Sequence, residues 1–319
     1  MRKSSILGIG SYLPKSLVTN DELACTVETS DEWIVKRTGI RQRYIAADDQ
    51  MTSDMAVEAA KLALNDSGIN KQDVDLIVVA TTTPDRTFPS CATIVQSKLE
   101  CKNAFAFDIQ AVCSGFIYAM AIADNFIKSG QVNVSLVIGA EVMSRILDWK
   151  DRSTCVLFGD GAGAVVLSNN SARNTGVIST ILYSDGTLHN LLYTSGGTAY
   201  NGVAGTICMN GTVVFEHAIE KLSASIVEIL NKNNLSIDEV NWFVLHQANI
   251  RIIELVARRL KIPSEKMVIS INQHANTSAA SIPLALSYAK NSGKLKQDDL
   301  VILAAIGAGI TWGVCLVRM

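Results

Sequence analysis

The stretch Phe107-Asp108-Ile109-Gln110-Ala111-Val112-Cys113-Ser114-Gly115-Phe116 decides how this chain folds. An apolar segment at residues 104–107 leads into a turn, and apolar residues at helical spacing follow from Phe116 to Ile127. Cys113 therefore lies where a buried segment passes into the N-terminus of a buried helix. The unpaired N–H groups of such a terminus carry roughly half a positive charge, which favours a thiolate over a thiol. Because a cysteine is also a small hydrophobe, Cys113 alone decides nothing about function.

The composition of the chain excludes several classes of function. It has 319 residues, of which 48% are hydrophobic and 18% are charged, and its formal net charge is −2. This is enough for a large core in one or two domains, and the near-neutral charge gives no support for nucleic acid as a partner. No apolar run approaches the roughly 20 residues that span a bilayer, and the four histidines show no clustered ligand spacing. We therefore expect neither membrane association nor a metal site.

Cysteine usage and the N-terminus indicate the compartment. The seven cysteines are an odd number without a CxxC pair, and the N-terminus does not resemble a signal peptide. Both features predict reduced thiols in a cytoplasmic protein.

The order of the expected elements indicates an α/β fold. Apolar runs predict strands at residues 4–12, 74–81, 135–140, 240–245, 300–305 and 311–317. Helices are predicted between Ser30 and Gly39, at residues 53–67 and at residues 278–290. Strands that alternate with helices are typical of layered α/β proteins. A glycine run at residues 158–163 resembles a nucleotide fingerprint, but it leads into a β-branched strand and not a helix, so we reject a nucleotide-binding loop.

The two halves of the chain resemble each other. Residues 64–79 align with residues 230–245 at a constant offset of 166, and Ser129-Gly130 aligns with Ser292-Gly293 at an offset of 163. Common α/β patterns also align by chance, but the length of these blocks favours a duplication. We therefore predict two similar halves, residues 1–171 and 172–319. At the second offset Cys113 falls opposite Asn276, and a pseudo-twofold axis would bring the two helix starts into one central site.

Three polar residues lie at the ends of buried elements: Cys113, His246 after the strand at residues 240–245, and Asn276 at the start of the following helix. A histidine or an asparagine at such a place is more often structural. Together, however, the three residues supply a thiolate nucleophile, an imidazole and an uncharged amide donor, and no acidic general base is evident near them. This set suits acyl transfer through a thioester, followed by chemistry at an enolate whose oxygen needs donors.

The motifs around these residues resemble those of the β-ketoacyl-acyl carrier protein synthase III family. The similarity is carried by residues 111–116, 246–251 and 276–281, and residues 30–35, 37–41, 158–164 and 311–313 also fit. It runs from about residue 5 to the C-terminus. The resemblance implies a thiolase-like α/β fold with five layers, αβαβα, made of two pseudo-symmetric halves and assembled as a homodimer.

The resemblance also implies the reaction. A short acyl-CoA, typically acetyl-CoA, condenses with malonyl-acyl carrier protein to give acetoacetyl-acyl carrier protein, CO₂ and CoA, which initiates fatty acid biosynthesis without a cofactor. By this resemblance Cys113 accepts the acyl group, and the backbone N–H groups of Cys113 and Ala308 form the oxyanion hole. His246, which must stay neutral, and Asn276 hold the malonyl thioester oxygen while decarboxylation produces the enolate.

Further residues match binding positions of the family. Trp33 and Arg152 resemble the pair that holds the CoA adenine, and Arg37 resembles a phosphate contact. The positions that match the pantetheine tunnel are Thr29, Gly211, Phe215 and Asn249. Phe88 resembles a residue that a dimer partner inserts to limit the acyl chain, which predicts a short primer. The residues that match the surface for the acidic carrier protein are Gln247, Arg251, Arg258 and Arg259.

Two positions depart from the family pattern, and two other functions stay open. Glu216 stands where a basic residue is common, and Thr212 replaces a longer polar residue, so carrier-protein docking is expected to depend more on the arginines. The alternatives are a starter enzyme of secondary metabolism that uses another acyl group, and a non-catalytic binding protein of the same fold. A thiolase would need a second catalytic cysteine, and the late Cys315 lies in the terminal strand.

Overall fold

The computed structural model describes residues 3–169 and 175–319, and its N-terminal half forms a five-stranded sheet. The order of the strands is β1 (Ser4–Tyr12), β7 (Gly161–Asn169), β6 (Val134–Glu141), β4 (Leu76–Ala80) and β5 (Phe105–Ile109). β7 pairs antiparallel with β1 and β6, whereas β4 pairs parallel with β6 and β5. β4 is buried along its whole length, as expected for a central strand of a sheet that is covered on both faces.

The second sheet repeats this topology with four strands. Their order is β8 (Gly176–Ser184), β13 (Thr311–Arg318), β12 (Leu300–Gly307) and β11 (Trp242–Leu245). β13 pairs antiparallel with β8 and β12, and β11 pairs parallel with β12, which are the directions of β1, β7, β6 and β4. At the fifth position a single parallel bridge joins Phe243 and Met267. The two sheets are the pseudo-symmetric halves expected from the repeat, while the predicted boundary between residues 171 and 172 lies outside the described residues.

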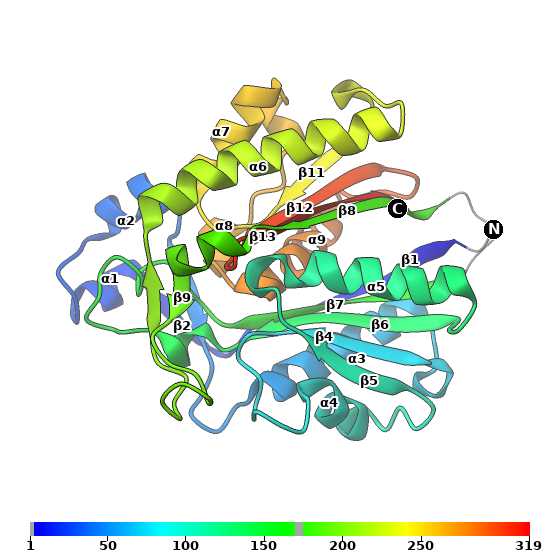
Figure 1. Ribbon diagram of the computed structural model, residues 1–319, viewed down its shortest axis with the longest axis horizontal. Helices are drawn as coiled ribbons and strands as arrows, with labels where there is room; N and C mark the ends of the chain where they lie inside the picture. Colours follow the sequence, from blue (N-terminus) through cyan, green and yellow to red (C-terminus); the bar gives the residue numbers. More distant parts are fainter. Residues whose placement is uncertain (1–2, 170–174) are drawn as a thin grey trace.

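Helices complete five layers (Figure 1). The first sheet is covered on its outer face by α3 (Thr52–Ser67) and α4 (Cys91–Leu99), and the second by α6 (Gly211–Lys232) and α7 (Ile250–Leu260). Between the sheets lie α5 (Gly115–Ser129) and α9 (Ser281–Asn291), which contact both of them. This is the thiolase-like αβαβα architecture that the sequence predicted.

Short elements connect the layers. They are α1 (Asn20–Ala24), α2 (Asp31–Thr38), α8 (Ile271–His274), the pairs β2 (Ser16–Thr19) with β3 (Gln42–Ile45) and β9 (Leu192–Thr194) with β10 (Ile207–Met209), and the 3₁₀ turns η1 (Lys71–Asp73), η2 (Val112–Ser114), η3 (Met143–Ile146), η4 (Gly186–Leu191), η5 (Ile237–Glu239), η6 (Ser264–Lys266) and η7 (Ser278–Ala280). α2 has the predicted ends, since the Ser30 hydroxyl accepts from the Trp33 N–H at 3.1 Å and Gly39 closes the helix at φ +79°. The glycine run forms β7 and no phosphate-binding helix start, as predicted.

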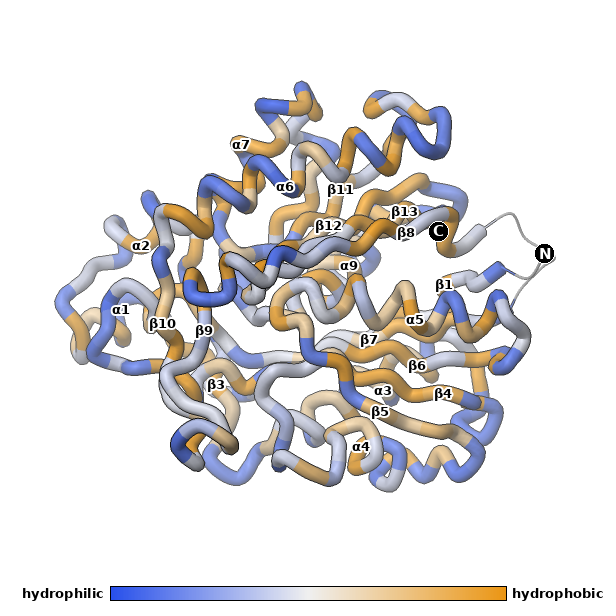
Figure 2. The backbone as a smooth tube through the Cα atoms, viewed as in Figure 1, coloured by the Kyte–Doolittle hydropathy of each residue, from blue (hydrophilic) through white to orange (hydrophobic). Residues whose placement is uncertain are grey.

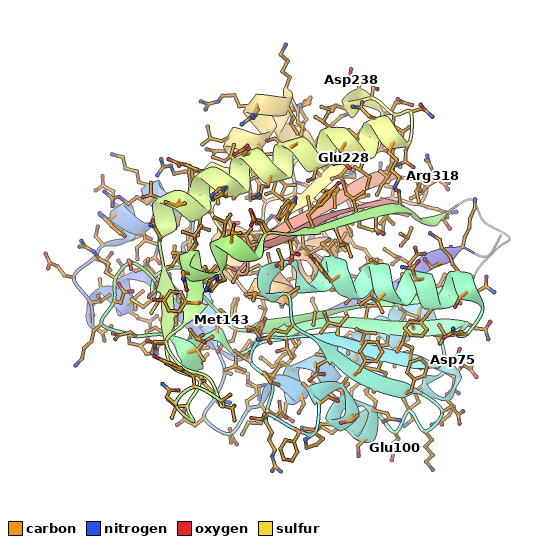
Figure 3. All side chains as sticks on the ribbon, viewed as in Figure 1. Asp75, Glu100, Met143, Glu228, Asp238 and Arg318 are labelled. Carbon is orange, nitrogen blue, oxygen red and sulfur yellow. The ribbon has the colours of Figure 1, made fainter. Side chains whose placement is uncertain are left out.

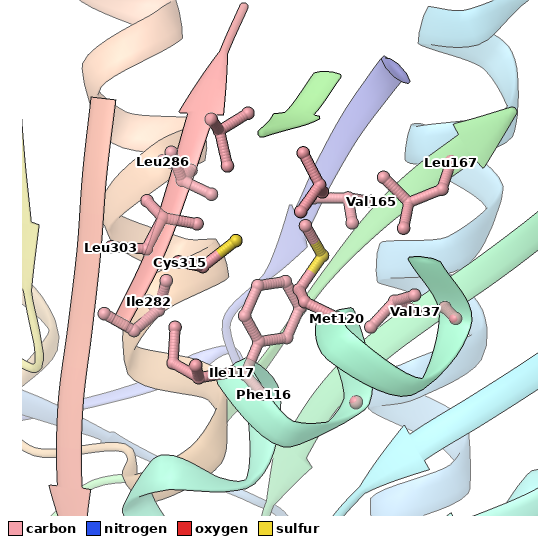
Figure 4. Close-up of a cluster of buried hydrophobic side chains, with 14 of the residues drawn as sticks. Phe116, Ile117, Met120, Val137, Val165, Leu167, Ile282, Leu286, Leu303 and Cys315 are labelled. Atoms are coloured by element: carbon pink, nitrogen blue, oxygen red, sulfur yellow. The ribbon is translucent and has the colours of Figure 1, made fainter. Parts of the chain in front are cut away.

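One large cluster of the core lies between the two sheets, and two others lie under the helices on their outer faces. Figure 4 shows Phe116 and Met120 of α5 between Val165 of the first sheet and Leu303 of the second, with all four side chains fully buried. Burying one such side chain stabilises the fold by roughly 1.5–3 kcal/mol. Cys315 lies in the same core and lines neither of the cavities that Cys113 lines. In Figure 2 the strands are mainly hydrophobic, whereas α6 alternates between hydrophilic and hydrophobic residues, as a helix with one buried face does.

The structure corrects the register of the internal repeat. η2 precedes α5 and η7 precedes α9, so both turns and both helix starts keep the offset of 166. Val112 and Ser278, which open the two turns, have nearly the same left-handed φ, +47° and +48°. The counterpart of Cys113 is therefore Ala279 and not Asn276. α9 has 11 residues and α5 has 15, so the offset changes to 163 only beyond the helix starts.

Candidate active site

Cys113 lies in the middle of η2, between the edge strand β5 and the central helix α5. Val112, just before it, has a φ of +47°, a left-handed conformation that a β-branched residue rarely adopts. Such a conformation persists only where the surrounding structure holds it, and it is common at functional sites. Here it shapes the turn that presents the thiol at the start of α5.

The end of β12 packs directly on this backbone. A Cβ atom at Gly307 would lie 2.7 Å from the Cys113 amide nitrogen and 2.8 Å from the Ala111 carbonyl oxygen, so no side chain fits there. The hydroxyl of Thr311 lies within hydrogen-bonding distance of the Ala111 and Ala308 carbonyl oxygens, at 3.1 and 3.0 Å. The backbone of Cys113 and the backbone of Ala308 are thereby held as neighbours.

Burial controls the ionisation of Cys113. The residue is 4% exposed, and burial raises the pKa of its thiol to about 12. The nearby Ser278 hydroxyl lowers this pKa, and the negative charge of Glu141 raises it. Burial therefore acts against the thiolate that the helix terminus was expected to favour. The thiol needs a proton acceptor when it attacks.

His246 follows β11 and enters the site from the C-terminal half. Its backbone N–H donates to the Ala304 carbonyl oxygen at 2.8 Å, which extends the pairing of β11 with β12 and fixes the position of the ring. The residue is 4% exposed, and burial lowers its pKa to about 3. At neutral pH the imidazole is therefore uncharged and can donate one N–H, as the proposed chemistry requires.

Asn276 lies between α8 and η7, and the α-helix that was expected to begin beside it begins only at Ser281. Its backbone N–H donates to the Leu157 carbonyl oxygen at 2.9 Å, and its carbonyl accepts from the Gly159 N–H at 3.0 Å. Its side-chain oxygen accepts from the Ser278 N–H at 2.9 Å. Because a backbone N–H can only donate, this bond identifies the oxygen and leaves the amide NH₂ as a donor.

One cavity brings the three residues together. Its walls include Cys113, His246, Asn276, Gly211, Phe215 and Asn249. A second cavity meets the first at Cys113 and is lined mainly by apolar side chains and by Ala308. Its apolar walls include Met143 (labelled in Figure 3), Ile146, Phe158, Leu192 and Ile207. Cys113 therefore lies where a group could arrive through one cavity and be held in the other.

Two buried residues of the site were missed from the sequence. Glu141 and Ser278 are both 0% exposed, and the Ser278 hydroxyl donates to Glu141 Oε1 at 3.0 Å. The negative charge of Glu141 raises the pKa of the Cys113 thiol, so an acidic group does lie near the nucleophile. A glutamate at the end of the apolar strand β6 could have indicated a buried carboxylate. Nothing in the sequence, however, connects that strand end with Ser278.

A surface hollow, which we call the entrance hollow, adjoins the first cavity. It is lined by Ser30, Glu32, Trp33, Lys36, Arg37 and Arg251. The guanidinium carbons of Arg37 and Arg152 lie 4.4 and 4.9 Å from the centre of the Trp33 ring. Arg251 also lies 5.2 Å over the ring of Phe215, which lines the first cavity. The contact between Arg251 and Phe215 therefore places the entrance hollow beside the first cavity.

Gln247 does not belong to a docking surface. It is 1% exposed, and its side chain donates to the Leu245 and Val268 carbonyl oxygens at 2.7 and 3.1 Å. Its Oε1 accepts from the Ser270 and Ile271 N–H groups at 2.8 and 3.0 Å. The prediction that Gln247 contacts the carrier protein is wrong, because its buried side chain joins the end of β11 to the start of α8.

The other predicted residues lie outside the two cavities. Arg258 and Arg259 are exposed on the last turn of α7, and Glu216 and Thr212 are exposed on the first turns of α6. Phe88 is 82% exposed, in the loop before α4. Thr29 is half-buried just before α2. The roles expected of these residues stay predictions.

Among residues 3–169 and 175–319, no group of three His, Cys, Asp or Glu side chains is arranged to hold a metal ion. Within the same residues, no helix has both the length and the apolar character needed to cross a bilayer. All seven cysteines are free thiols.

The two repeated sheets, with Cys113, His246 and Asn276 in one cavity at the ends of their elements, define a thiolase-like condensing enzyme. A family model described as 3-oxoacyl-[acyl-carrier-protein] synthase III matches residues 107–186, and one for the C-terminal part of that family matches residues 230–319. The chain is 99% identical, over all of both chains, to β-ketoacyl-[acyl-carrier-protein] synthase III of Ehrlichia ruminantium (strain Gardel). It belongs to the β-ketoacyl-acyl carrier protein synthase III family and is an acyltransferase.

Solved structures agree with this assignment. The crystal structure of 3-oxoacyl-[acyl-carrier-protein] synthase III from Aquifex aeolicus VF5 is similar with a TM-score of 0.95 and 46% identity, covering 99% of this chain and 100% of that chain. The priming β-ketosynthase of the R1128 polyketide pathway is similar with a TM-score of 0.94 and 33% identity, covering 99% of this chain and 96% of that chain. Both structures share the fold, so the fold does not separate the two functions. The 99% identity to the Ehrlichia ruminantium enzyme, against 33% to the polyketide enzyme, favours fatty acid synthesis over the secondary-metabolite alternative.

Proposed function

We propose that this chain initiates fatty acid synthesis by condensing an acyl-CoA with malonyl-acyl carrier protein, and that acetyl-CoA is its acyl donor. The observation that carries the proposal is that Cys113, His246 and Asn276 line one cavity. The products are acetoacetyl-acyl carrier protein, CO₂ and CoA.

In the first half-reaction Cys113 attacks the acyl carbon and CoA leaves. The backbone N–H groups of Cys113 and Ala308 stabilise the negative oxygen of the tetrahedral intermediate. Support for this role comes from the close contact of Gly307 with the Cys113 nitrogen and from Ala308 on the wall of the second cavity. The acyl group then occupies that second cavity.

In the second half-reaction His246 and Asn276 hold the malonyl thioester oxygen. Loss of CO₂ leaves an enolate, and two neutral donors stabilise its oxygen without protonating its carbon. The pKa of about 3 supports this role for His246, because an imidazolium would give up its proton to the carbanion. The hydrogen bond that turns the Asn276 oxygen toward Ser278 supports the amide NH₂ as the second donor.

The path of the substrate follows the entrance hollow. Trp33 and Arg152 would hold the adenine of CoA, and Arg37 its phosphates. Arg152 already lies over the Trp33 ring, so a flat base can enter between them only if the arginine moves aside. The pantetheine would then pass Phe215 and Asn249, which line the first cavity, with Gly211 beside them and Thr29 near the entrance.

A homodimer and a short primer belong to the same proposal. β5 is the edge strand of its sheet, and Phe105 on it is 46% exposed, so a second copy could pair there. Phe88 is 82% exposed on a loop anchored by Asp85, which accepts from the Ser53 N–H at 2.9 Å. We expect the partner's copy of this phenylalanine to close the second cavity, which limits the primer to a short acyl chain.

Docking of the acidic carrier protein would use Arg251, Arg258 and Arg259 on α7. All three are exposed, and Arg251 also lines the entrance hollow, so a docked carrier would deliver its malonyl arm at the same opening. Seven free thiols fit a reducing compartment, which supports the cytoplasm as the place of action.

The test is incubation with radiolabelled acetyl-CoA, isobutyryl-CoA and hexanoyl-CoA, each with malonyl-acyl carrier protein, while product and labelled Cys113 are followed. Acetyl-CoA should label Cys113 fastest and give product. Cys113→Ala should lose labelling but keep some malonyl decarboxylation, whereas His246→Ala and Asn276→Ala should be labelled but lose decarboxylation. Absence of label on Cys113 in the wild type, or normal condensation by His246→Ala, would overturn the proposal.

A further inference from the structure

Arg43 on β3 is the largest completely buried side chain among the described residues. Burial lowers its pKa to about 10, so it still carries its charge at neutral pH. Within the part of the chain that the structure describes, no carboxylate forms an ion pair with it, and its Nε has no hydrogen-bond partner. The nearby Cys155 thiol gives no counter-charge, because burial raises the pKa of that thiol. An apolar side chain would fill this space at a lower free-energy cost, so the guanidinium calls for a specific reason.

The guanidinium holds one end of a segment, residues 156–160, that we call the clamp segment. Arg43 Nη2 donates to the Val156 carbonyl oxygen at 3.0 Å. The backbone of β3 holds the other end, since the Asp160 N–H donates to the Tyr44 carbonyl oxygen at 2.8 Å. The clamp segment is therefore fixed to β3 at both ends, by a side chain at the first residue and by the backbone at the last.

The clamp segment in turn holds the backbone of Asn276. The Asn276 N–H donates to the Leu157 carbonyl oxygen at 2.9 Å, and the Asn276 carbonyl oxygen accepts from the Gly159 N–H at 3.0 Å. The packing is tight at Gly159, where a Cβ atom would lie 3.0 Å from the Arg43 Cβ and 3.1 Å from the His274 carbonyl oxygen. Arg43, the clamp segment and the loop that carries Asn276 are therefore in direct contact, and a shift of the first is passed to the last.

We propose that Arg43 is a positioning residue for Asn276, an inference that rests on the function proposed above. By fixing the Val156 carbonyl oxygen, Arg43 fixes where the clamp segment places the Asn276 amide on the wall of the first cavity. In the second half-reaction this amide donates to the malonyl thioester oxygen, whose negative charge grows as CO₂ leaves. A displacement of about 1 Å at such a donor can slow the chemical step about 100-fold. Cys113 is held by η2 and the end of β12 instead, so its acylation should not depend on Arg43.

The experiment measures the two half-reactions separately in Arg43→Met, which keeps an unbranched chain in the buried space and removes the donors. Acylation of Cys113 is followed with radiolabelled acetyl-CoA. Release of CO₂ from malonyl-acyl carrier protein is followed in a Cys113→Ala background, where the nucleophile plays no part. Arg318→Met is the matched control, because the Arg318 guanidinium also donates to a backbone carbonyl oxygen, that of Asp298 at 3.1 Å. Arg318 ends β13 at the opposite end from Thr311, which contacts the site (Figure 3).

Arg43→Met should decarboxylate about 100-fold more slowly and acylate Cys113 at the wild-type rate, whereas Arg318→Met should keep both rates. In an Asn276→Ala background, Arg43→Met should not lower the residual decarboxylation further, because a residue that acts through Asn276 then has nothing left to position. A purely structural role would slow both half-reactions alike and would add to the loss in Asn276→Ala, and either result overturns the proposal, as does normal decarboxylation by Arg43→Met.

Gly159→Ala tests the same contact from the other side, and it decides the question if Arg43→Met does not fold. Its new methyl group would lie 3.0 Å from the Arg43 Cβ and would push the clamp segment away from β3. Decarboxylation should therefore fall while acylation of Cys113 stays unchanged, and equal effects on the two half-reactions would overturn the proposal. Failure of wild-type Cys113 to label would instead reject the proposed function.

Discussion

Replacing Gly307 with alanine tests whether the end of β12 holds Cys113 in its reactive position. The new Cβ atom would lie 2.7 Å from the Cys113 nitrogen, 2.8 Å from the Ala111 oxygen and 3.0 Å from the Ser114 nitrogen, where ordinary contacts begin at 3.4 Å. All three atoms belong to the backbone, and Val112 already holds this turn at a strained φ. The turn must therefore move as a unit, because no flexible side chain can give way.

Two effects should follow from that movement. Overpacking of this kind destabilises a fold by about 1–3 kcal/mol, which a urea titration measures. Displacing one donor of an oxyanion hole slows the chemical step by about 10²–10³-fold, so acylation of Cys113 by labelled acetyl-CoA should fall by that factor. Gly186→Ala is the matched control, because its Cβ atom meets nothing within 4 Å. Wild-type acylation by a folded Gly307→Ala protein would refute this account of the oxyanion hole.

Three further predictions concern binding and stability. Trp33→Ala should raise the KM for acetyl-CoA about tenfold, the loss expected of a stacking contact worth roughly 1–2 kcal/mol, and should leave acylation by a small acetyl thioester unchanged. Arg258→Glu with Arg259→Glu should raise the KM for malonyl-acyl carrier protein, most strongly at low salt, and equal values at low and high salt would count against docking there. His274 is 8% exposed, and burial lowers its pKa from 6.5 to about 4, so the unfolded chain binds more protons and stability falls as the pH drops below 6.5. Linkage puts this loss at about 2 kcal/mol at pH 5, so His274→Gln should unfold with a smaller difference between pH 7 and pH 5, and an unchanged difference would reject the cause.

The parts of the site that depend on local pattern could be predicted from the sequence. His246 follows the buried strand β11, and Cys113 follows β5, which was expected to be buried but is a half-buried edge strand. Both positions can be identified by counting along the chain. Ser30 and Gly39 likewise fix both ends of α2 through local capping. Such features need no knowledge of which strand lies beside which, so the sequence contains them.

Features that depend on contacts between segments distant in the sequence could not be predicted. Gln247 follows His246 directly and reads as an exposed polar residue, yet the chain buries it and uses its amide to hold the loop from Ser270. The pKa of Cys113 depends on how deeply α5 lies between the sheets, which no local pattern reports. Glu141 and Ser278 are 137 residues apart, and only the packing of η7 on the end of β6 brings them together.

The corrected register explains why the site has one nucleophile although the fold is repeated. Val112 and Ser278 are equivalent residues with the same left-handed φ, so each half builds the same turn at the start of its central helix. In the first half the turn presents Cys113, whereas the equivalent position in the second half is Ala279, which carries no reactive group. The second turn contributes the Ser278 hydroxyl at the point where the first half has only a valine. The repeated backbone therefore places a thiol from one half next to a hydroxyl from the other, and the difference between the two turns produces the site.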